Sequence, residues 1–413
     1  MQAPPLPRPS SLDYNHADID LEALKHNFRT IQDFAYGRKL MAVVKGDAYG
    51  HGLKECARYL IDAGAVLLGV MDAKEGAELR EAGFVKPEIC VLAGLTTELQ
   101  VRAAVKNDLT VFVYGPEQLL TLATAASKDT RRIKAFLKID TGMSRLGVAW
   151  NQAADFLMLA LTNPHLEVRG LATHLATIGD AAAVSQLTRF WGVCERAEEI
   201  FRRPLANSAL SGGAMLAHPD YPDGISRVGL ALYGVGPALS SGPPPPRLAR
   251  IWSPDTPPPP PPLEEQAREL PEASRKCVSK LKPVMRVTSR VLQVKTVRRG
   301  EAVSYGGTYR AERELRVAVL PAGYVHGLQV CRSGKCAAII RGKVAPQLGI
   351  VCMNLSVYDA TGIPSVQPGD EAVLLGTQDG AFLGPRGAPG EDISPYETLC
   401  LFGRLNRRRY SWG

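Results

Sequence analysis

The chain has 413 residues, of which 45% are hydrophobic and 22% are charged, the composition of a globular protein with two or three domains. A chain that is disordered throughout is therefore excluded. The 49 basic and 41 acidic residues give a formal net charge of +8, which is spread along the chain without a long basic block. This charge is compatible with small acidic substrates as well as with nucleic acid, so it selects neither.

The cysteines and the apolar segments indicate a compartment. The eight cysteines include no C-x-x-C pair and no recognisable disulfide framework, which favours a reducing environment. Residues 1–9 contain no apolar core of signal-peptide length, and no stretch approaches the roughly 18 apolar residues that a membrane helix needs. We therefore expect a cytoplasmic protein without membrane contacts.

Residues 17–238, which follow a short N-terminal arm (1–16), are predicted to alternate strands with helices. Eight short apolar runs indicate the strands: 40–45, 66–70, 89–92, 109–113, 133–139, 168–173, 203–206 and 224–228. Between them, apolar residues at helical spacing predict helices such as 52–63, 72–82, 96–107 and 182–201. This alternation predicts the α/β class and a (β/α)₈ TIM-type barrel. An open doubly wound sheet is the alternative, although no G-x-G-x-x-G follows the first strand.

The composition changes after the predicted barrel. Twelve of the 31 prolines fall between positions 243 and 271, so we interpret residues 239–280 as an extended insertion or linker. Binding of a partner through these prolines is the alternative. Strand-like runs then recur at 284–297, 315–320, 337–340 and 372–375, and they predict a mainly β domain over residues 281–413.

Polar residues at the carboxyl ends of the predicted strands are candidates for chemistry, because active sites of such barrels lie on that face. The first strand ends at Lys45, which could form a Schiff base or act as a general base if it is partly desolvated. The fifth is followed by Arg145, which could bind a carboxylate, and the sixth by His174. Ser208, with 229–230, could form a phosphate cup. Each residue alone also fits an ordinary structural role, but together they describe a site for pyridoxal 5′-phosphate.

At these residues the chain resembles the alanine racemase family of fold-type III pyridoxal-phosphate enzymes. Residues 45–52 (KGDAYGHG) resemble the signature around the cofactor lysine, and 138–147 (KIDTGMSRLG) resemble the K-x-D-T-G-M-x-R-x-G motif. Residues 304–309 (SYGGTY) resemble the segment around the second catalytic base. Arg227, 228–230, Asn207, Ser208 and the pair 352–353 also align. The resemblance covers most of the chain apart from the proline-rich segment and the extreme N-terminus.

The resemblance implies a two-base racemisation of L- and D-alanine that supplies D-alanine for peptidoglycan. Lys45 would bind the cofactor and serve one enantiomer, and Tyr305 from the partner subunit of a homodimer would serve the other. The remaining roles implied are cofactor binding by Tyr49, His174, Asn207, Ser208, Arg227, Gly229 and Leu230, and substrate binding by Arg145, Met353 and Tyr324. Lys138 is the candidate for a carbamylated lysine. Neither a metal nor nucleic acid is implied.

The chain departs from the family pattern at Asn354 and at 325–326 (VH), where carboxylates are usual, and this leaves the substrate range open. A broader serine and alanine racemase is therefore one alternative. A fold-type III amino-acid decarboxylase is another, but Tyr305 would then have no evident task. A cofactor carrier without catalysis, or a barrel whose working part is the prolines, is disfavoured by the β domain and by Lys45, Arg145 and Arg227.

Overall fold

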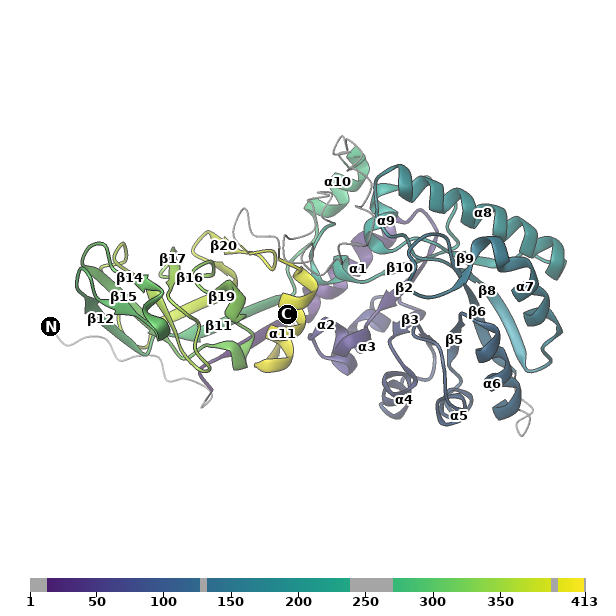
Figure 1. Ribbon diagram of the computed structural model, residues 1–413, viewed down its shortest axis with the longest axis horizontal. Coiled ribbons are helices and arrows are strands. Elements are labelled where there is room, and N and C mark those ends of the chain that lie inside the picture. The colour runs from purple at the N-terminus through teal and green to yellow at the C-terminus, as the bar shows by residue number, and fades with distance from the viewer. Residues whose placement is uncertain (1–12, 127–131, 238–269, 388–392, 412–413) are drawn as a thin grey trace, which may run out of the picture. The chain divides into compact units, whose positions relative to one another are not determined.

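The computed structural model describes residues 13–126, 132–237, 270–387 and 393–411, and the chain divides into two units (Figure 1). The first, here the β unit, comprises Met1–Ala23, Tyr49–Gly52 and Pro283–Gly413. The second, here the barrel unit, comprises Leu24–Ala48 and Leu53–Lys282. The chain thus passes between the units several times, once between Ala48 and Tyr49, shortly after Lys45.

The barrel unit contains a parallel sheet of eight strands that nearly closes on itself. In spatial order the strands are β10 (Ile225–Val228), β2 (Lys39–Val43), β3 (Leu67–Val70), β4 (Glu88–Val91), β5 (Thr110–Val113), β6 (Ile133–Asp140), β8 (Leu166–Ala172) and β9 (Ala206–Ser208). A short strand, β7 (Val148–Ala149), pairs with β6. The segment after β9 approaches β10, where Ser211 and Arg227 form a parallel bridge. The alternative of an open doubly wound sheet is therefore wrong, and the predicted barrel is confirmed.

Helices cover the outside of these strands, as α4 to α8 show in Figure 1. The helices assigned between residues 21 and 279 are α1 (Leu21–Phe34), α2 (Lys45–Tyr49), α3 (Leu53–Asp62), α4 (Ala73–Glu81), α5 (Glu98–Lys106), α6 (Pro116–Ala126), α7 (Ala153–Thr162), α8 (Ala181–Phe201), α9 (Gly212–Ala217) and α10 (Glu272–Ser279), with 3₁₀ turns η1 (Trp150–Gln152) and η2 (Leu230–Tyr233). Several begin at side-chain caps: Asp72 accepts from the amide of Glu75, and Thr97 and Gln100 form a capping box.

Large apolar side chains fill the barrel, so it is a packed core and not a pore. One cluster of buried residues draws on seven different strands: Met41, Leu67, Cys90, Phe112, Phe136, Ala172 and Ile225. Gly170 allows β8 and β9 to approach each other, because a Cβ at this position would lie 1.8 Å from the carbonyl oxygen of Ala206. A rigid core of this kind holds the strand ends, and the side chains that follow them, in fixed positions.

The β unit is a ten-stranded, mainly antiparallel sheet with a separate hairpin. Its strands are, in spatial order, β12 (Gln293–Val297), β15 (Leu315–Leu320), β18 (Ser356–Asp359), β17 (Lys343–Leu348), β16 (Ala337–Ile340), β19 (Glu371–Gln378), β11 (Met285–Arg290), β1 (His16–Asp20) and β21 (Arg407–Ser411), with β20 (Ala381–Leu383) beside β19 and the hairpin β13 (Ala302–Val303) and β14 (Tyr309–Arg310). Helix α11 (Pro395–Leu405) and the 3₁₀ turns η4 (Tyr305–Gly307), η5 (Tyr324–His326) and η6 (Val330–Arg332) complete it.

Most predicted elements are confirmed, with shifts of a few residues at their ends. The seventh barrel strand differs most: it begins at Ala206 and not at Arg203, because Pro204 has no amide hydrogen for a parallel ladder. Strand β1 was not predicted, and it pairs within the β unit. Residues 238–269 of the proline-rich segment lie outside the described residues, whereas Glu272–Ser279 near its end form α10. No helix in the described part of the chain combines the length and the apolar character required to cross a membrane.

Candidate active site

The carboxyl ends of the barrel strands carry most of the predicted site residues. Lys45 follows β2, Lys138 lies near the end of β6, His174 follows β8, and Arg227 lies in β10. Because the strands are parallel and the barrel nearly closed, these side chains meet at one mouth. Their mutual electrostatic influence, described below, agrees with this placement.

The loop that begins at Lys45 has an unusual backbone. Gly46, Asp47 and Ala48 follow it with φ of 66°, 58° and 53°, a left-handed turn that L-residues adopt only at a cost of roughly 1–2 kcal/mol each. Glu75 stabilises the turn, since its Oε1 accepts from the amides of Gly46 at 2.7 Å and Asp47 at 3.2 Å. The carboxylate of Asp47 accepts in turn from the amide of Leu53 at 2.8 Å. The half-buried lysine is thus held on a constrained segment, not on a free loop.

Arg227 is buried, and its guanidinium is surrounded by acceptors. Nη1 donates to the carbonyl oxygen of Ser208 at 2.6 Å and to its hydroxyl oxygen at 2.5 Å. Nη2 donates to the carbonyl oxygens of Thr173 at 2.7 Å and Ala209 at 3.2 Å. These contacts, which come from the ends of β8 and β9, fix the guanidinium plane without neutralising its charge.

His174 lies against this guanidinium, with its Nδ1 3.1 Å from Nη2 of Arg227. An arginine nitrogen can only donate, so Nδ1 accepts and the imidazole is neutral. The pKa of His174 is lowered to about 2. Burial is the largest cause, and the positive charges of Arg227, Lys138, Arg145 and Lys45 follow. The ring therefore offers an uncharged face within a group of cations and cannot act as a base at neutral pH.

Lys138 is buried in the same region, and burial together with the charges of Arg227 and Arg145 lowers its pKa well below the usual value for lysine. The loop after it is organised by Asp140, whose Oδ1 accepts from the amides of Gly142 and Met143, both at 2.9 Å. Gly147 returns beside β6, where a Cβ would lie 2.6 Å from the amide nitrogen of Asp140. Arg145, which this loop carries, is exposed.

Sequence reasoning missed one buried residue at the site, Asp223. Its Oδ1 accepts from the amide of Ala209 at 2.7 Å, and its Oδ2 accepts from the amide of Leu210 at 3.2 Å and from the hydroxyl of Ser226 at 2.9 Å. Burial raises its pKa to about 6 despite these bonds. Its position four residues before Arg227 was the only signal, and an aspartate before a short strand is usually a turn residue.

The residues predicted to form a phosphate cup lie at the end of β9 or follow β10. Ser208 is fully buried, and its hydroxyl already donates to the carbonyl oxygen of Ile225 at 2.7 Å. In this structure Ser208 therefore supports Arg227, and its hydroxyl is not directed at the mouth as a spare donor. Gly229 and Leu230 precede the first hydrogen bond of η2, from the amide of Leu232 to the carbonyl of Gly229, as the amides of an anion site do. Asn207 is half-buried and lies beside Cys194.

The remaining candidates belong to the β unit. Tyr305 begins η4 and Tyr324 begins η5. Met353 follows Cys352, whose atoms contact the segments of both tyrosines. The sulfur of Cys352 lies 3.3 Å from the hydroxyl of Ser304, next to Tyr305, and its carbonyl accepts from the amide of Tyr324 at 3.1 Å. All three side chains are exposed, Tyr305 at 70%. One surface of the β unit thus presents two phenols and a thioether to the outside.

Tyr49 also belongs to the β unit, although it comes only four residues after Lys45. Its ring packs beside that of Tyr396, with centroids 5.9 Å apart. The next residue, Gly50, is fixed by α11, because a Cβ there would lie 2.7 Å from the carbonyl oxygen of Leu399. Burial raises the pKa of Tyr49, so its phenol stays protonated and can serve as a hydrogen-bond donor.

Comparisons with known proteins agree with this arrangement. Residues 19–237 match the family model of the alanine racemase N-terminal domain, and residues 284–410 match that of the C-terminal domain. The chain is 36% identical to the alanine racemase of Nostoc sp., covering 93% of this chain and 92% of the relative, and 33% identical to that of Sorangium cellulosum, covering 95% and 98%. The crystal structure of alanine racemase from D-cycloserine-producing Streptomyces lavendulae matches with a TM-score of 0.83 at 30% identity, over 98% of both chains. The resemblance seen in the sequence is thus confirmed, and the chain belongs to the alanine racemase family of isomerases.

Proposed function

We propose that the protein interconverts L- and D-alanine with pyridoxal 5′-phosphate and supplies D-alanine for peptidoglycan. The observation that carries this proposal is the barrel mouth, where Lys45 shares one electrostatic environment with a buried Arg227 and a neutral His174. Membership in the family indicates racemisation of alanine, and the side chains at the barrel mouth are suited to this reaction.

The donor set of this mouth fits the cofactor. Lys45, Lys138, Arg145 and Arg227 all act on His174, so positive charge is concentrated where an anionic phosphate and a substrate carboxylate would bind. Lys45 is the only lysine among them on the constrained turn, and we propose that it forms the covalent bond to the cofactor. When bound, pyridoxal phosphate withdraws electrons from the Cα of an amino acid and so weakens its Cα–H bond.

We propose that two bases handle the Cα proton, one on each side. The amine of Lys45 takes or returns the proton on one face of Cα. The phenol of Tyr305 does so on the other face. A phenol with a pKa of about 10 is a weak base in water, so it needs a cation nearby, and Arg145 is assigned this task together with binding of the substrate carboxylate.

The exposure of Tyr305 supports the proposal that the active site is shared in a homodimer. A catalytic base that is 70% exposed would exchange protons with water, whereas a barrel mouth of a second subunit placed over it would exclude water. Met353 and Tyr324, which are exposed on the same surface, would then bound the substrate pocket. We propose that each mouth is completed by the β unit of the partner.

Lys138 is proposed to be carbamylated. A lysine must be neutral to react with carbon dioxide, and the lowered pKa of Lys138 favours the neutral amine. The neutral amine forms a nitrogen–carbon bond with carbon dioxide and releases one proton, so an uncharged group is replaced by an anion. That anion would attract Arg145 and Arg227, whereas a protonated lysine would repel both.

Arg227 and its neighbours are proposed to set the electronic state of the cofactor ring. A guanidinium has no lone pair that can accept a hydrogen bond and only donates, so a pyridine nitrogen that faced Arg227 would stay unprotonated, which would limit side reactions. His174 would stack beside the ring, uncharged because of its low pKa. We propose that Tyr49, Gly229 and Leu230 bind the phosphate of the cofactor. Ser208 and Asn207 are assigned to the same end of the cofactor, and Ser208 acts mainly by accepting a hydrogen bond from Arg227.

Two alternatives remain proposals of lower rank. A serine and alanine racemase would use the same bases and differ only in the pocket near Met353 and Asn354. A decarboxylase would leave Tyr305 without a task. We also propose a cytoplasmic location.

The decisive experiment is a racemase assay with both enantiomers of alanine, serine and lysine. Because the two enantiomers of alanine have equal free energies, Tyr305→Phe should lower racemisation equally in both directions. Exchange of the Cα hydrogen with deuterated water should nevertheless persist for the enantiomer that Lys45 serves and be lost for the other. Tyr309→Phe, in the same hairpin, is the control and should retain activity.

Three results would contradict the proposal. Equal loss of exchange for both enantiomers would remove the one-sided role of Tyr305. A Lys45→Ala protein that still bound the cofactor covalently, seen as colour that survives dialysis and is bleached by borohydride, would refute the assignment of Lys45. Release of carbon dioxide from an amino acid without racemisation would favour the decarboxylase.

A further inference from the structure

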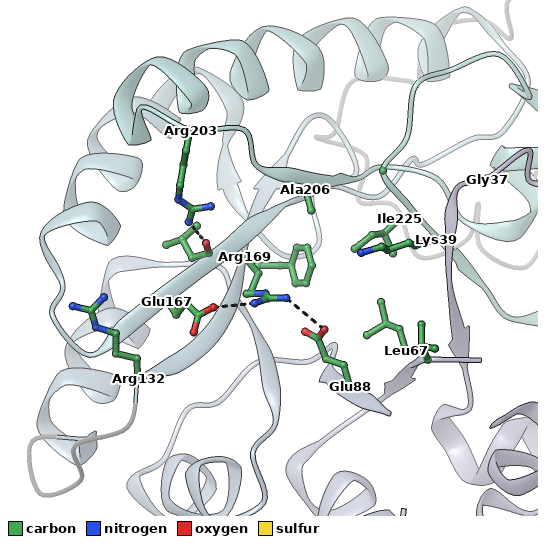
Figure 2. Close-up of a pocket in the computed structure, with 14 residues that line it drawn as sticks. Gly37, Lys39, Leu67, Glu88, Arg132, Glu167, Arg169, Arg203, Ala206 and Ile225 are labelled. Carbon is green, nitrogen blue, oxygen red and sulfur yellow. Dashed lines mark hydrogen bonds and ion pairs between the residues drawn. The ribbon is translucent and has the colours of Figure 1, made fainter. Parts of the chain in front are cut away.

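The barrel has a seam between β9 and β10, the two strands at the ends of its spatial order. Strand β10 forms four residue pairs with β2 on its other side, whereas among the described residues a single bridge, between Ser211 and Arg227, joins it to the segment after β9. At the end of the barrel where the strands begin, the seam borders a cavity of about 690 Å³ whose wall includes Ala206 and Ile225 (Figure 2). The position of β10 relative to β9 therefore depends on the hydrogen bonds that cross the seam.

Arg227 lies on one side of this seam, and its acceptors lie on the other. Its guanidinium donates to both oxygens of Ser208 and to the carbonyl oxygens of Ala209 and Thr173, at the ends of β9 and β8. Its backbone amide donates to the carbonyl oxygen of Leu210 at 2.9 Å. A small movement of the seam would weaken these bonds together, because each needs a short distance and a straight angle.

Asp223 joins the two sides of the seam next to Arg227. It precedes β10, and its carboxylate accepts from the amides of Ala209 at 2.7 Å and Leu210 at 3.2 Å on the other side. It also accepts from the hydroxyl of Ser226, the residue directly before Arg227, at 2.9 Å. Asp223 thus holds both the segment that carries the acceptors and the strand that carries the guanidinium.

The peptide group between Ala209 and Leu210 connects the two charged side chains. Its carbonyl oxygen accepts from Nη2 of Arg227 at 3.2 Å, and its amide donates to Oδ2 of Asp223. Hydrogen bonds at both ends of one peptide group polarise it and strengthen each other. Fixing the amide end of this peptide therefore also fixes the oxygen that Arg227 binds.

The charge of Asp223 acts on Arg227 in the same direction. Both side chains are buried, with 3% and 6% of their surface exposed. Burial lowers the pKa of Arg227, and the carboxylate of Asp223 opposes this effect because it stabilises the cation. A buried charge without such a partner is costly, so the carboxylate favours the buried position of the guanidinium.

We propose that Asp223 is a positioning residue that holds the guanidinium of Arg227 in place at the barrel mouth. Asp223 acts through Arg227 and is not assigned a contact with the substrate. This role rests on the proposed function, in which Arg227 faces the pyridine nitrogen of the cofactor and limits side reactions. A residue that only closed the barrel would affect stability alone, whereas a positioning residue also affects which reaction follows removal of the Cα proton.

Crystal structures of the full chain, as purified, test the positioning directly. In Asp223→Asn the bond between Arg227 and the carbonyl of Ala209 should be broken, and in Ser226→Ala, which keeps both amide bonds of Asp223, it should lengthen less. The control is Asn163→Ala, which removes hydrogen bonds with Leu119 and His165 between α7 and β8 and should leave Arg227 in place. If Arg227 kept all its bonds in both test variants, the proposal would be overturned.

The ratio of transamination to racemisation tests the consequence for the chemistry. In transamination the amino group of alanine passes to the cofactor, and the carbon skeleton leaves as pyruvate. Pyruvate formed per alanine racemised does not depend on how much of the protein is folded, so loss of stability alone does not change it. The ratio should rise about tenfold in Asp223→Asn, since a hydrogen bond to a charged group is lost. It should change less than twofold in Asn163→Ala.

The two measurements distinguish failure of this role from failure of the proposed function. Displacement of Arg227 without a rise in the ratio would overturn the role of Asp223, because the position of the guanidinium would then not matter to the reaction. If the unmodified protein did not racemise alanine at all, the proposed function would fail. The crystal structures would still decide whether Asp223 positions Arg227.

Discussion

Replacement of Asp223 by Asn should change how the stability of the barrel depends on pH. In the folded protein burial raises the pKa of this carboxyl from 3.8 to about 6. A raised pKa means that the protonated form is favoured in the native state, so the stability it contributes is present below pH 3.8 and is lost as the pH rises through 6. The shift of about 2 pKa units corresponds to about 3 kcal/mol at 1.36 kcal/mol per unit.

Most of this loss of stability falls within a pH range in which unfolding can be measured. Between pH 4.5 and 7.5 the ionisation of Asp223 should lower the free energy of unfolding by about 2 kcal/mol. Asn cannot ionise, so Asp223→Asn removes this dependence. Its NH2 group replaces one of the two acceptor oxygens, so the hydrogen bonds from the amides of Ala209 and Leu210 cannot both be kept and the variant is less stable at both pH values. Other titrating groups cancel when the two proteins are compared.

Urea unfolding of both proteins at pH 4.5 and 7.5 measures the effect. The stability difference between unmodified protein and Asp223→Asn should be about 2 kcal/mol larger at the lower pH. A difference that does not vary with pH, or one that grows toward pH 7.5, would show that the hydrogen bonds from Ala209, Leu210 and Ser226 outweigh burial. The carboxylate would then be stable in its ionised form, and the reasoning would fail.

Two further predictions rest on other parts of the barrel. Since the pKa of His174 is about 2, this residue should not titrate between pH 5 and 9, and the pH profile of racemisation should contain no step from it. His174→Phe should therefore retain the shape of the profile, although it should bind the cofactor less tightly. If a step near pH 6 to 7 disappeared in the variant, the low pKa would be wrong. Gly170→Ala should prevent β8 and β9 from pairing, because the new Cβ would lie 1.8 Å from the carbonyl oxygen of Ala206, and thermal unfolding should reveal a loss of several kcal/mol. The control, Gly192→Ala, adds a methyl to α8 where nothing lies within 4 Å and should stabilise by about 1 kcal/mol; similar melting of the two variants would mean that the strand contact is not needed.

The sequence predicted the barrel well because its strands are short apolar runs that are buried on both faces. Such runs are visible without knowledge of their partners, and 315–320 and 337–340 in the β unit were predicted to the residue for the same reason. Strand β1 (HADID) was missed because it alternates polar and apolar residues and depends on pairing with β11, more than 260 residues later. Local pattern does not contain that information.

From the pattern of strands alone, the candidate site was predictable only at the strand ends. Lys45 and Arg227 could be placed at the mouth because strands in a barrel are parallel. The hydrogen bond of the Ser208 hydroxyl to Ile225 and the acceptor role of Asp223 depend on side-chain geometry across strands, and no spacing encodes them. The left-handed turn after Lys45 was hidden for a similar reason: Gly46 permits positive φ, but Asp47 and Ala48 adopt it because Glu75 binds the turn.

The position of β1 affects the order in which the chain can fold during synthesis. Residues of β1 leave the ribosome before the strands that they pair with, which are β11 (Met285–Arg290) and β21 (Arg407–Ser411). The barrel unit, whose sequence lies between them, can assemble while β1 has no neighbour. During that interval β1 is an unpaired strand of the nascent protein, so a chaperone that shields residues 16–20 would act before β21 emerges and not afterwards.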